Sequence, residues 1–240
     1  MDHTLRYEVN CSILFTELPL LERPMAARAA GFDAVEFWWP FTEAVPSDSD
    51  ADAFVSAVRD AGVQLAALNF FAGDMRAGER GVASSPARSG EFRDNVDVAI
   101  GIGERLGCKK FNALYGNRAD GVAAAAQEET GTENLALAAQ AAACIGGTVL
   151  IEPLSGIPAY PVRTATDAIA VIDRVQIAHG VSNIALLADL YHLAVNNDDV
   201  DTVIARCTNS EPADHDVASP KSVQRASQCC EILRCWLARF

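Results

Sequence analysis

The sequence lacks the features that would direct it to a membrane or to a disulfide-stabilised fold. No apolar run approaches the roughly 20 residues that a membrane-spanning helix needs, and the N-terminus has neither the basic segment nor the long apolar segment of a secretory signal. Its seven cysteines follow no spacing typical of a disulfide framework. We therefore expect a cytoplasmic protein with no membrane partner.

The chain also lacks an excess of positive charge and a glycine-rich phosphate-binding motif. Its 240 residues carry a formal net charge of −13, which argues against nucleic acid and against an anionic membrane surface as partners. No G-x-G-x-x-G follows the first strand-like run, and no G-x-x-x-x-G-K-[ST] occurs in the sequence. A nucleotide-binding protein is therefore disfavoured.

The sequence does contain a regular alternation of strand-like and helix-like segments. The predicted strands are residues 7–10, 34–38, 63–69, 110–114, 148–151 and 184–188, and the predicted helices are 21–31, 49–62, 91–107, 132–144, 164–179 and 198–206. Six βα units in succession imply an α/β fold with a parallel sheet. Their mean repeat of about 30 residues is compatible with a (β/α) TIM barrel and with a doubly wound sheet.

Two of the predicted strands end abruptly on a carboxylate. Residues 148–154 read TVLIEPL and residues 184–192 read IALLADLYH, so Glu152 and Asp189 directly follow apolar runs. Either acid alone is equally well explained as a helix N-cap or a loop ion pair. Together they favour a barrel, because chemistry in (β/α) barrels lies at the C-terminal strand ends. Two carboxylates at that rim also suit a hard divalent cation with oxygen ligands.

Side chains in or beside the long glycine-rich loop at residues 70–89 are further candidates. Loops of this length are usually functional or mobile. Asn69, Asp74 and Arg80 could contact a small carboxylate substrate there, and the alternative is that each is a solvated loop residue. The sequence leaves both interpretations open.

Four segments give the chain a resemblance to the hydroxypyruvate isomerases, within the xylose isomerase-like TIM-barrel superfamily of sugar isomerases and epimerases. The segments are AVEFWWPF (34–41), LNFFAGDMRAGERGVASSPAR (68–88), IEPLS (151–155) and DLYH (189–192). The resemblance extends from about Arg6 to Arg206. It implies an isomerase of glyoxylate metabolism that interconverts hydroxypyruvate and tartronate semialdehyde. A 2-oxo-tetronate isomerase and a ketose 3-epimerase are the related alternatives, so the substrate is a small 2-oxo acid or a ketose.

The same resemblance implies roles for individual residues. Glu152 matches a family residue that is both catalytic base and metal ligand, and Asp189 matches a second ligand of one divalent ion, magnesium or manganese. His192 matches a residue that hydrogen-bonds a substrate oxygen, although a lone histidine after a strand is often only a structural hydrogen-bonder. Asn69 and Arg80 remain candidate substrate contacts. Two further ligands, including a second base, are expected from strands seven and eight.

The last 34 residues depart from this pattern. No strand-seven or strand-eight motif is found in residues 207–240, which carry four basic and four acidic residues and four of the seven cysteines. We predict a partial TIM-barrel domain over residues 1–206 and an atypical tail over 207–240, with an amphipathic helix at 229–240. The tail is either an unrelated, frame-shifted ending or a divergent ending that completes the barrel. A frame-shifted ending implies a catalytically inactive or poorly active chain. The sequence does not indicate the oligomeric state.

Overall fold

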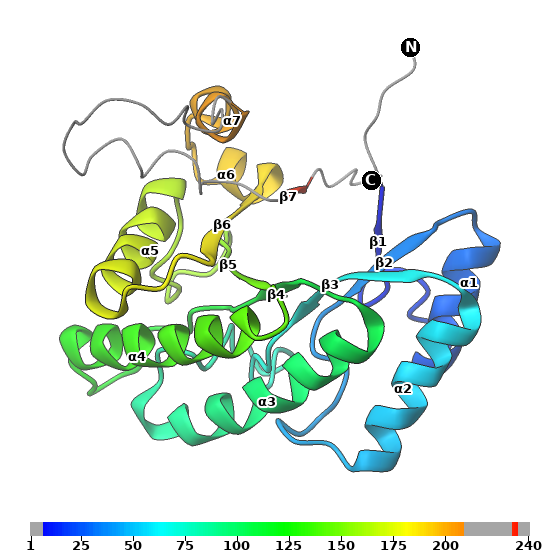
Figure 1. The fold of residues 1–240 in the computed structure, drawn as a ribbon. Helices are drawn as coiled ribbons and strands as arrows, with labels where there is room; N and C mark the ends of the chain where they lie inside the picture. Colours follow the sequence, from blue (N-terminus) through cyan, green and yellow to red (C-terminus); the bar gives the residue numbers. More distant parts are fainter. Residues whose placement is uncertain (1–6, 209–231, 235–240) are drawn as a thin grey trace, which may run out of the picture.

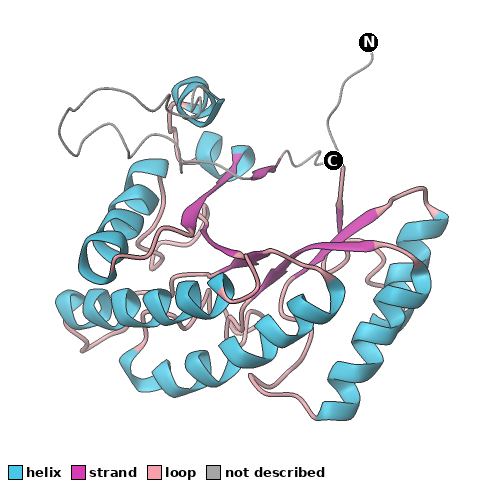
Figure 2. Ribbon diagram, viewed as in Figure 1, coloured by secondary structure: helices cyan, strands magenta, loops and turns pink. Residues whose placement is uncertain are grey.

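The computed structural model describes residues 7–208 and 232–234, in which strands and helices alternate (Figure 2). The strands are β1 (Val9–Asn10), β2 (Ala34–Phe37), β3 (Gln64–Asn69), β4 (Lys110–Asn112), β5 (Thr148–Ile151), β6 (Ile184–Asp189) and β7 (Ile232–Arg234). The helices are α1 (Arg23–Ala29), α2 (Asp48–Ala61), α3 (Ser89–Leu106), α4 (Ala124–Ala143), α5 (Ala165–His179), α6 (Leu190–Val195) and α7 (Val200–Thr208). Two 3-10 turns, η1 (Leu20–Glu22) and η2 (Pro86–Arg88), precede α1 and α3. The predicted α/β fold is confirmed.

The strands form one parallel sheet in which each strand pairs with the next along the chain, from β1 to β7. Figure 1 shows this sheet curving like the wall of a barrel, with the long helices α2, α3, α4 and α5 on its outer side. Among the described residues no strand joins β7 to β1. The barrel wall is therefore open at that point, as the prediction of an incomplete TIM barrel implies.

The strand β7 corrects part of the prediction for the tail. The sequence predicts no strand after residue 206 and a helix at 229–240, but Ile232–Arg234 pair with Leu187–Asp189 of β6. The edge of β6 presents backbone N–H and C=O groups that another strand can satisfy, and a short apolar run does not distinguish strand from helix by periodicity. The rest of the tail prediction concerns residues 209–231 and 235–240, which lie outside the described part of the chain.

Two helices also differ from the prediction. Helix α4 begins at Ala124 rather than Thr132, and it contains Gly131, a residue that lowers helix propensity. A Cβ atom at Gly131 would lie 2.9 Å from the Tyr115 ring, so close packing explains the glycine. Helix α6 follows β6 without a loop, because the Asp189 side chain accepts the His192 N–H and caps the helix.

The main hydrophobic core lies between the sheet and the helices. Alternate strand residues such as Phe37, Phe111 and Ile151 are buried in it. The opposite face of β5 and β6 carries a separate small cluster, which consists of Leu150, Ala185 and Leu187. Because side chains alternate between the two faces of a strand, this second cluster identifies the face that points towards the barrel interior.

Candidate metal and substrate site

Each of the strands β1 to β6 delivers one buried polar residue at or next to its C-terminal end. None of these residues is more than 9% exposed, and they are Asn10, Glu36, Asn69, Asn112, Glu152 and Asp189. Their neighbours in the sequence, among them Val9, Val35, Leu68, Phe111, Ile151 and Ala188, belong to the core beneath the helices. The alternation of strand faces therefore points the polar residues into the barrel. They form an arc that follows the strand order.

One end of this arc brings together the residues that could hold a metal ion. Glu152, Asp189 and His192 each offer one ligand atom, and these atoms all lie within 4.8 Å of one another. Both carboxylates are almost fully buried. The two carboxylates are oxygen donors of the kind that suits Mg²⁺ or Mn²⁺. The structure thus brings together the two residues predicted as metal ligands.

Glu152 is held at its side chain and at its backbone. The Asn112 side-chain N–H donates to Glu152 Oε2 at 2.6 Å. The Tyr160 hydroxyl donates to the Glu152 carbonyl at 3.2 Å and accepts the Tyr115 backbone N–H at 2.9 Å. Burial raises the pKa of Tyr160, so its hydroxyl stays protonated and remains a donor. The Tyr160 hydroxyl therefore ties the backbone just after β5 to the segment that follows β4.

His192 is oriented by Ser155, which lies in the segment after β5. The Ser155 backbone N–H donates to His192 Nδ1 at 3.2 Å, and the Ser155 hydroxyl lies 2.7 Å from the same nitrogen. A nitrogen that accepts a backbone N–H carries no proton, so in the neutral ring the proton sits on Nε2. In this arrangement His192 presents an N–H donor. That chemistry suits a substrate oxygen better than a metal ion.

A second contact ties the segments after β5 and β6 together. The Asn196 side chain, at the end of α6, donates to the carbonyls of Leu154 at 3.0 Å and Arg163 at 2.7 Å. The positions of Glu152 and His192 are thus coupled through neighbouring backbone, as well as through the Ser155 contact. This bracing keeps the three residues of the metal cluster close without placing another charge among them.

The two candidate substrate contacts, Asn69 at the end of β3 and Arg80 in the loop between β3 and α3, differ in their hydrogen bonds. Asn69 is 1% exposed, and its Nδ2 has no hydrogen-bond partner within the described residues. Arg80 uses one guanidinium nitrogen to donate to the carbonyls of Met75 at 2.9 Å and Glu79 at 2.6 Å. Asn69 therefore points into the barrel with a donor to offer, whereas these bonds of Arg80 stabilise its own loop.

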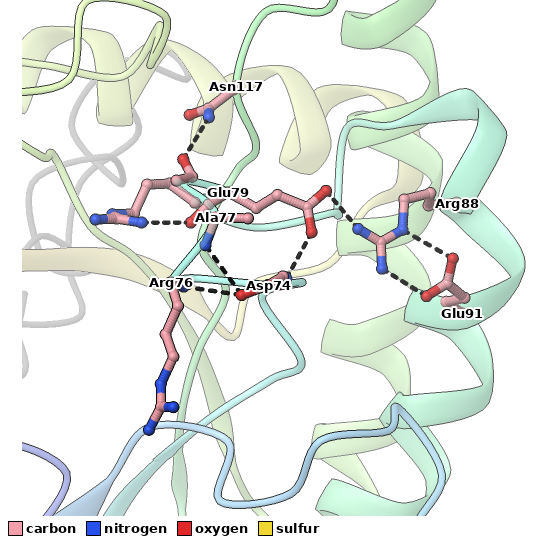
Figure 3. A network of polar contacts seen from close by, with 9 residues as sticks. Asp74, Arg76, Ala77, Glu79, Arg88, Glu91 and Asn117 are labelled. Atoms are coloured by element: carbon pink, nitrogen blue, oxygen red, sulfur yellow. Dashed lines mark hydrogen bonds and ion pairs between the residues drawn. The ribbon is translucent and has the colours of Figure 1, made fainter.

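Asp74 and Glu79 also stabilise this loop (Figure 3). Asp74 Oδ1 accepts the backbone N–H groups of Arg76 and Ala77, and Glu79 accepts the Asp74 N–H. The Arg88 guanidinium pairs with Glu79 and lowers the pKa of that carboxyl. Arg88 also pairs with Glu91 at 2.7 Å. Because the Asp74 side chain accepts hydrogen bonds within its own loop, a structural role is favoured over contact with a substrate.

The sequence alone does not identify three of the six buried polar residues, nor Ser155 and Asn196, which hold the segments after β5 and β6 together. Asn10, Glu36 and Asn112 sit inside short apolar strands, where a single polar residue does not stand out as long as each strand is taken alone. A comparison of the strand ends in register would have found them, because every strand from β1 to β6 has one. The roles of Ser155 and Asn196 depend on contacts across 37 and 42 residues and leave no local signal.

The comparisons with known proteins agree with this geometry. The sequence profile of the family described as "Xylose isomerase-like TIM barrel" matches residues 25–223, which extends past Arg206 into the tail. This chain belongs to that family. Within it, a Streptomyces coelicolor protein named "Putative hydroxypyruvate isomerase" is 53% identical over 83% of this chain and 73% of its own length.

Two further relatives have the same level of identity and different names. The hydroxypyruvate isomerase of Escherichia coli is 35% identical, over 79% of this chain and 70% of its own length. The 2-oxo-tetronate isomerase of Cupriavidus necator is 35% identical, over 81% of this chain and 72% of its own length. The isomerase class is therefore shared by relatives whose names specify different substrates.

Among solved structures, a Brucella melitensis protein described as an AP endonuclease of family 2 superposes with a TM-score of 0.73. It is 35% identical, and the match covers 85% of this chain and 76% of that chain. A D-psicose 3-epimerase superposes with a TM-score of 0.64 at 17% identity, which supports the barrel fold alone. In the described part of this chain, no helix is both long and apolar enough to cross a membrane.

Proposed function

We propose that this chain carries the site of a metal-assisted isomerase that interconverts hydroxypyruvate and tartronate semialdehyde. The observation that carries the proposal is the cluster of Glu152, Asp189 and His192 at the C-terminal rim of the barrel. Its support comes from the hydroxypyruvate isomerase names of relatives at 53% and 35% identity. The geometry and the names point to the same class of chemistry.

Glu152 and Asp189 would hold one divalent ion, magnesium or manganese. When bound, such an ion supplies positive charge that stabilises oxygens which become negative during proton transfer between adjacent carbons. The two carboxylates come from neighbouring strands, which pair in register from Val149 to Ile151 of β5. A rigid parallel pair of strands keeps the distance between two such ligands constant.

The proton transfer itself needs a base beside the carbon that loses its proton. Glu152 is placed for this role, because its carboxylate is buried at the rim and fixed by Asn112. It takes a proton from C3 of hydroxypyruvate, and the electron pair of the broken C–H bond forms the C2–C3 double bond of an enediolate. A proton is then returned to C2, while the proton of the C3 hydroxyl passes to O2, so that C3 becomes the aldehyde and C2 carries the hydroxyl. The second base that the family implies is expected from strand eight, which is not among the described residues.

Two donors would bind the substrate oxygens. His192 offers Nε2–H, as its contacts with Ser155 require. Asn69 offers an Nδ2 that is buried and has no partner in the described chain. An unsatisfied buried donor costs about 1–3 kcal/mol, and a substrate oxygen would remove that cost. Arg80 remains a candidate, because one of its three guanidinium nitrogens makes both bonds to the carbonyls of Met75 and Glu79.

A 2-oxo-tetronate is the second substrate candidate, because the 2-oxo-tetronate isomerase of C. necator is as similar as the E. coli hydroxypyruvate isomerase. The remaining alternative is a family member without activity. Two of the four ligands that the family implies are recognised in this chain, so a chain that binds no metal and turns over no substrate would support it.

Product analysis on the full-length chain tests the proposal. Hydroxypyruvate and a 2-oxo-tetronate are each incubated with the protein and Mg²⁺ or Mn²⁺, and the products are identified by NMR. We expect tartronate semialdehyde from hydroxypyruvate at a rate that depends on the metal. A faster reaction with the 2-oxo-tetronate would reassign the substrate. No product from either substrate, in a protein that binds neither metal, would identify an inactive family member.

A further inference from the structure

We propose that Asn112 is a positioning residue, which holds the Glu152 carboxylate in the orientation needed to bind the metal and to accept a proton. This inference rests on the proposed function and assigns a part to a residue that acts through Glu152. Its basis is the 2.6 Å hydrogen bond from Asn112 Nδ2 to Glu152 Oε2. Asn112 is fully buried and Glu152 is 4% exposed.

The backbone of Asn112 is held on both sides by the sheet. Asn112 pairs in register with Asn69 of β3 and Leu150 of β5, and its carbonyl accepts the Phe70 N–H at 2.9 Å. A side chain on a central strand has few rotamers available. The amide is therefore delivered to Glu152 by a rigid element, which is the requirement for positioning a catalytic group.

The chemistry of the two groups fixes the direction of the bond. An ionised carboxylate only accepts hydrogen bonds, so the NH₂ side of the amide must face Glu152. With Glu152 ionised, as metal binding requires, the bond is charge-assisted and lies in a buried site, where such bonds are strong. It holds Oε2 of a carboxylate that lies within 4.8 Å of the ligand atom of Asp189.

A second pair in the same protein provides a matched control. Asn10 of β1 donates to Glu36 of β2 at 2.6 Å, and both residues are buried. Each pair joins an asparagine to a glutamate from the next strand in the sheet. Glu36 is not part of the metal cluster found among the described residues. Loss of the amide should therefore cost similar stability at both sites but change metal binding at one.

The experiment compares Asn112→Ala, Asn112→Asp and Asn10→Ala in the full-length chain. Mn²⁺ affinity is measured by calorimetry, stability by denaturant unfolding, and kcat and KM with hydroxypyruvate. We expect Asn112→Ala to weaken Mn²⁺ binding about tenfold and to lower kcat about tenfold with little change in KM. Asn112→Asp keeps the shape but places a carboxylate against Glu152, so its loss of kcat should be larger.

Asn10→Ala should unfold at a lower denaturant concentration, as Asn112→Ala does, but keep the parent's Mn²⁺ affinity and kcat. Equal Mn²⁺ affinity and kcat in the parent and both Asn112 variants would overturn the positioning role while leaving the proposed function intact. Equal losses of Mn²⁺ affinity and kcat in Asn10→Ala and Asn112→Ala would show that the losses follow from lower stability. That result would also overturn the positioning role. A parent that binds no Mn²⁺ and forms no product would overturn the proposed function first, and the role of Asn112 with it.

Discussion

Two buried asparagine–glutamate pairs with the same donor–acceptor distance lie along the arc of polar residues, one at β1 and β2 and the other at β4 and β5. Asn112 donates to Glu152 and Asn10 donates to Glu36, each at 2.6 Å. Only Glu152 has a second carboxylate and a histidine within ligand distance in the part of the chain that the structure describes. A buried acid at the rim of the barrel is therefore not enough to make a candidate metal site. The neighbouring strand must also place a second carboxylate within ligand distance.

The largest expected effect is a difference in turnover between variants of the two glutamates, Glu152 and Glu36. Glu152→Gln removes the base and a metal ligand, and we expect hydroxypyruvate turnover to fall at least a hundredfold, since a general base contributes about 10²–10⁴-fold. Glu36→Gln keeps the cluster and should retain turnover within about tenfold. Steady-state kinetics of both variants check this. If Glu152→Gln stays within about tenfold of the parent, which is about 1.4 kcal/mol in barrier, its assignment is wrong.

The next effect concerns Asp189, which has both a metal role and a structural one. Asp189→Asn should preserve the fold, because asparagine also caps helices well and can still accept the His192 N–H. It should weaken divalent-metal binding. Saturating Mn²⁺ raises the melting temperature of a protein that binds it in the folded state. We expect this rise in the parent and in Glu36→Gln, and its absence in Asp189→Asn. A full rise in Asp189→Asn would remove that residue from the site.

His192 should show a smaller and different loss. His192→Ala removes an N–H donor to the substrate, so kcat/KM should fall about tenfold to a hundredfold, the order of one or two charge-assisted hydrogen bonds. Its Mn²⁺ affinity should stay near that of the parent, because the contacts with Ser155 leave Nε2 protonated. Tyr191→Phe, next in sequence and 47% exposed, is the control. A loss of Mn²⁺ affinity as large as that of Asp189→Asn would make His192 a ligand.

The smallest effect lies in the loop between β3 and α3, outside the compared rim sites. The Arg88 guanidinium lowers the pKa of Glu79, so this ion pair stabilises the loop above the ordinary titration range of glutamate, near pH 4. The stabilisation is lost as the pH falls through the lowered pKa. Because both side chains are partly exposed, the effect is small. Amide hydrogen exchange of residues 73–80, corrected for the intrinsic pH dependence, should show less protection at low pH. Arg88→Gln should abolish this difference, and equal pH dependence in both proteins would contradict it.

Much of the fold follows from local signals in the sequence. The predicted strand at 148–151 matches β5, and Thr164 caps α5 in a capping box with Asp167. Gly62 ends α2 in a left-handed conformation, which glycine adopts readily. These features depend on neighbouring residues only. The strand β7 depends on the exposed edge of β6, more than 40 residues away in the sequence, and no local pattern indicates it.

The site could be predicted only in part, for the same reason. Glu152 and Asp189 stand out because each ends a long apolar run, family resemblance adds a role for His192, and the position of Asn69 beside a long loop makes it a candidate. Asn112 lies in the middle of the predicted strand KFNAL, although in the structure it is the last residue of β4, so the sequence does not mark it as a strand end. Its contact with Glu152 crosses 40 residues. Arg80 fits a substrate contact by charge alone, but its bonds to Met75 and Glu79 favour a role within its own loop.

The central claim is proton transfer by Glu152 at a metal-dependent site, and isomerisation in D₂O tests it most directly. The full-length chain with Mn²⁺ is given hydroxypyruvate in D₂O, and the tartronate semialdehyde is examined by NMR. Because a carboxylate base exchanges its proton with solvent, we predict deuterium at C2 of the product, and no product from Glu152→Gln. Deuterium at C2 that appears as fast with Glu152→Gln, or with the parent protein stripped of metal, would contradict the account, because the transfer would then need neither this base nor the ion.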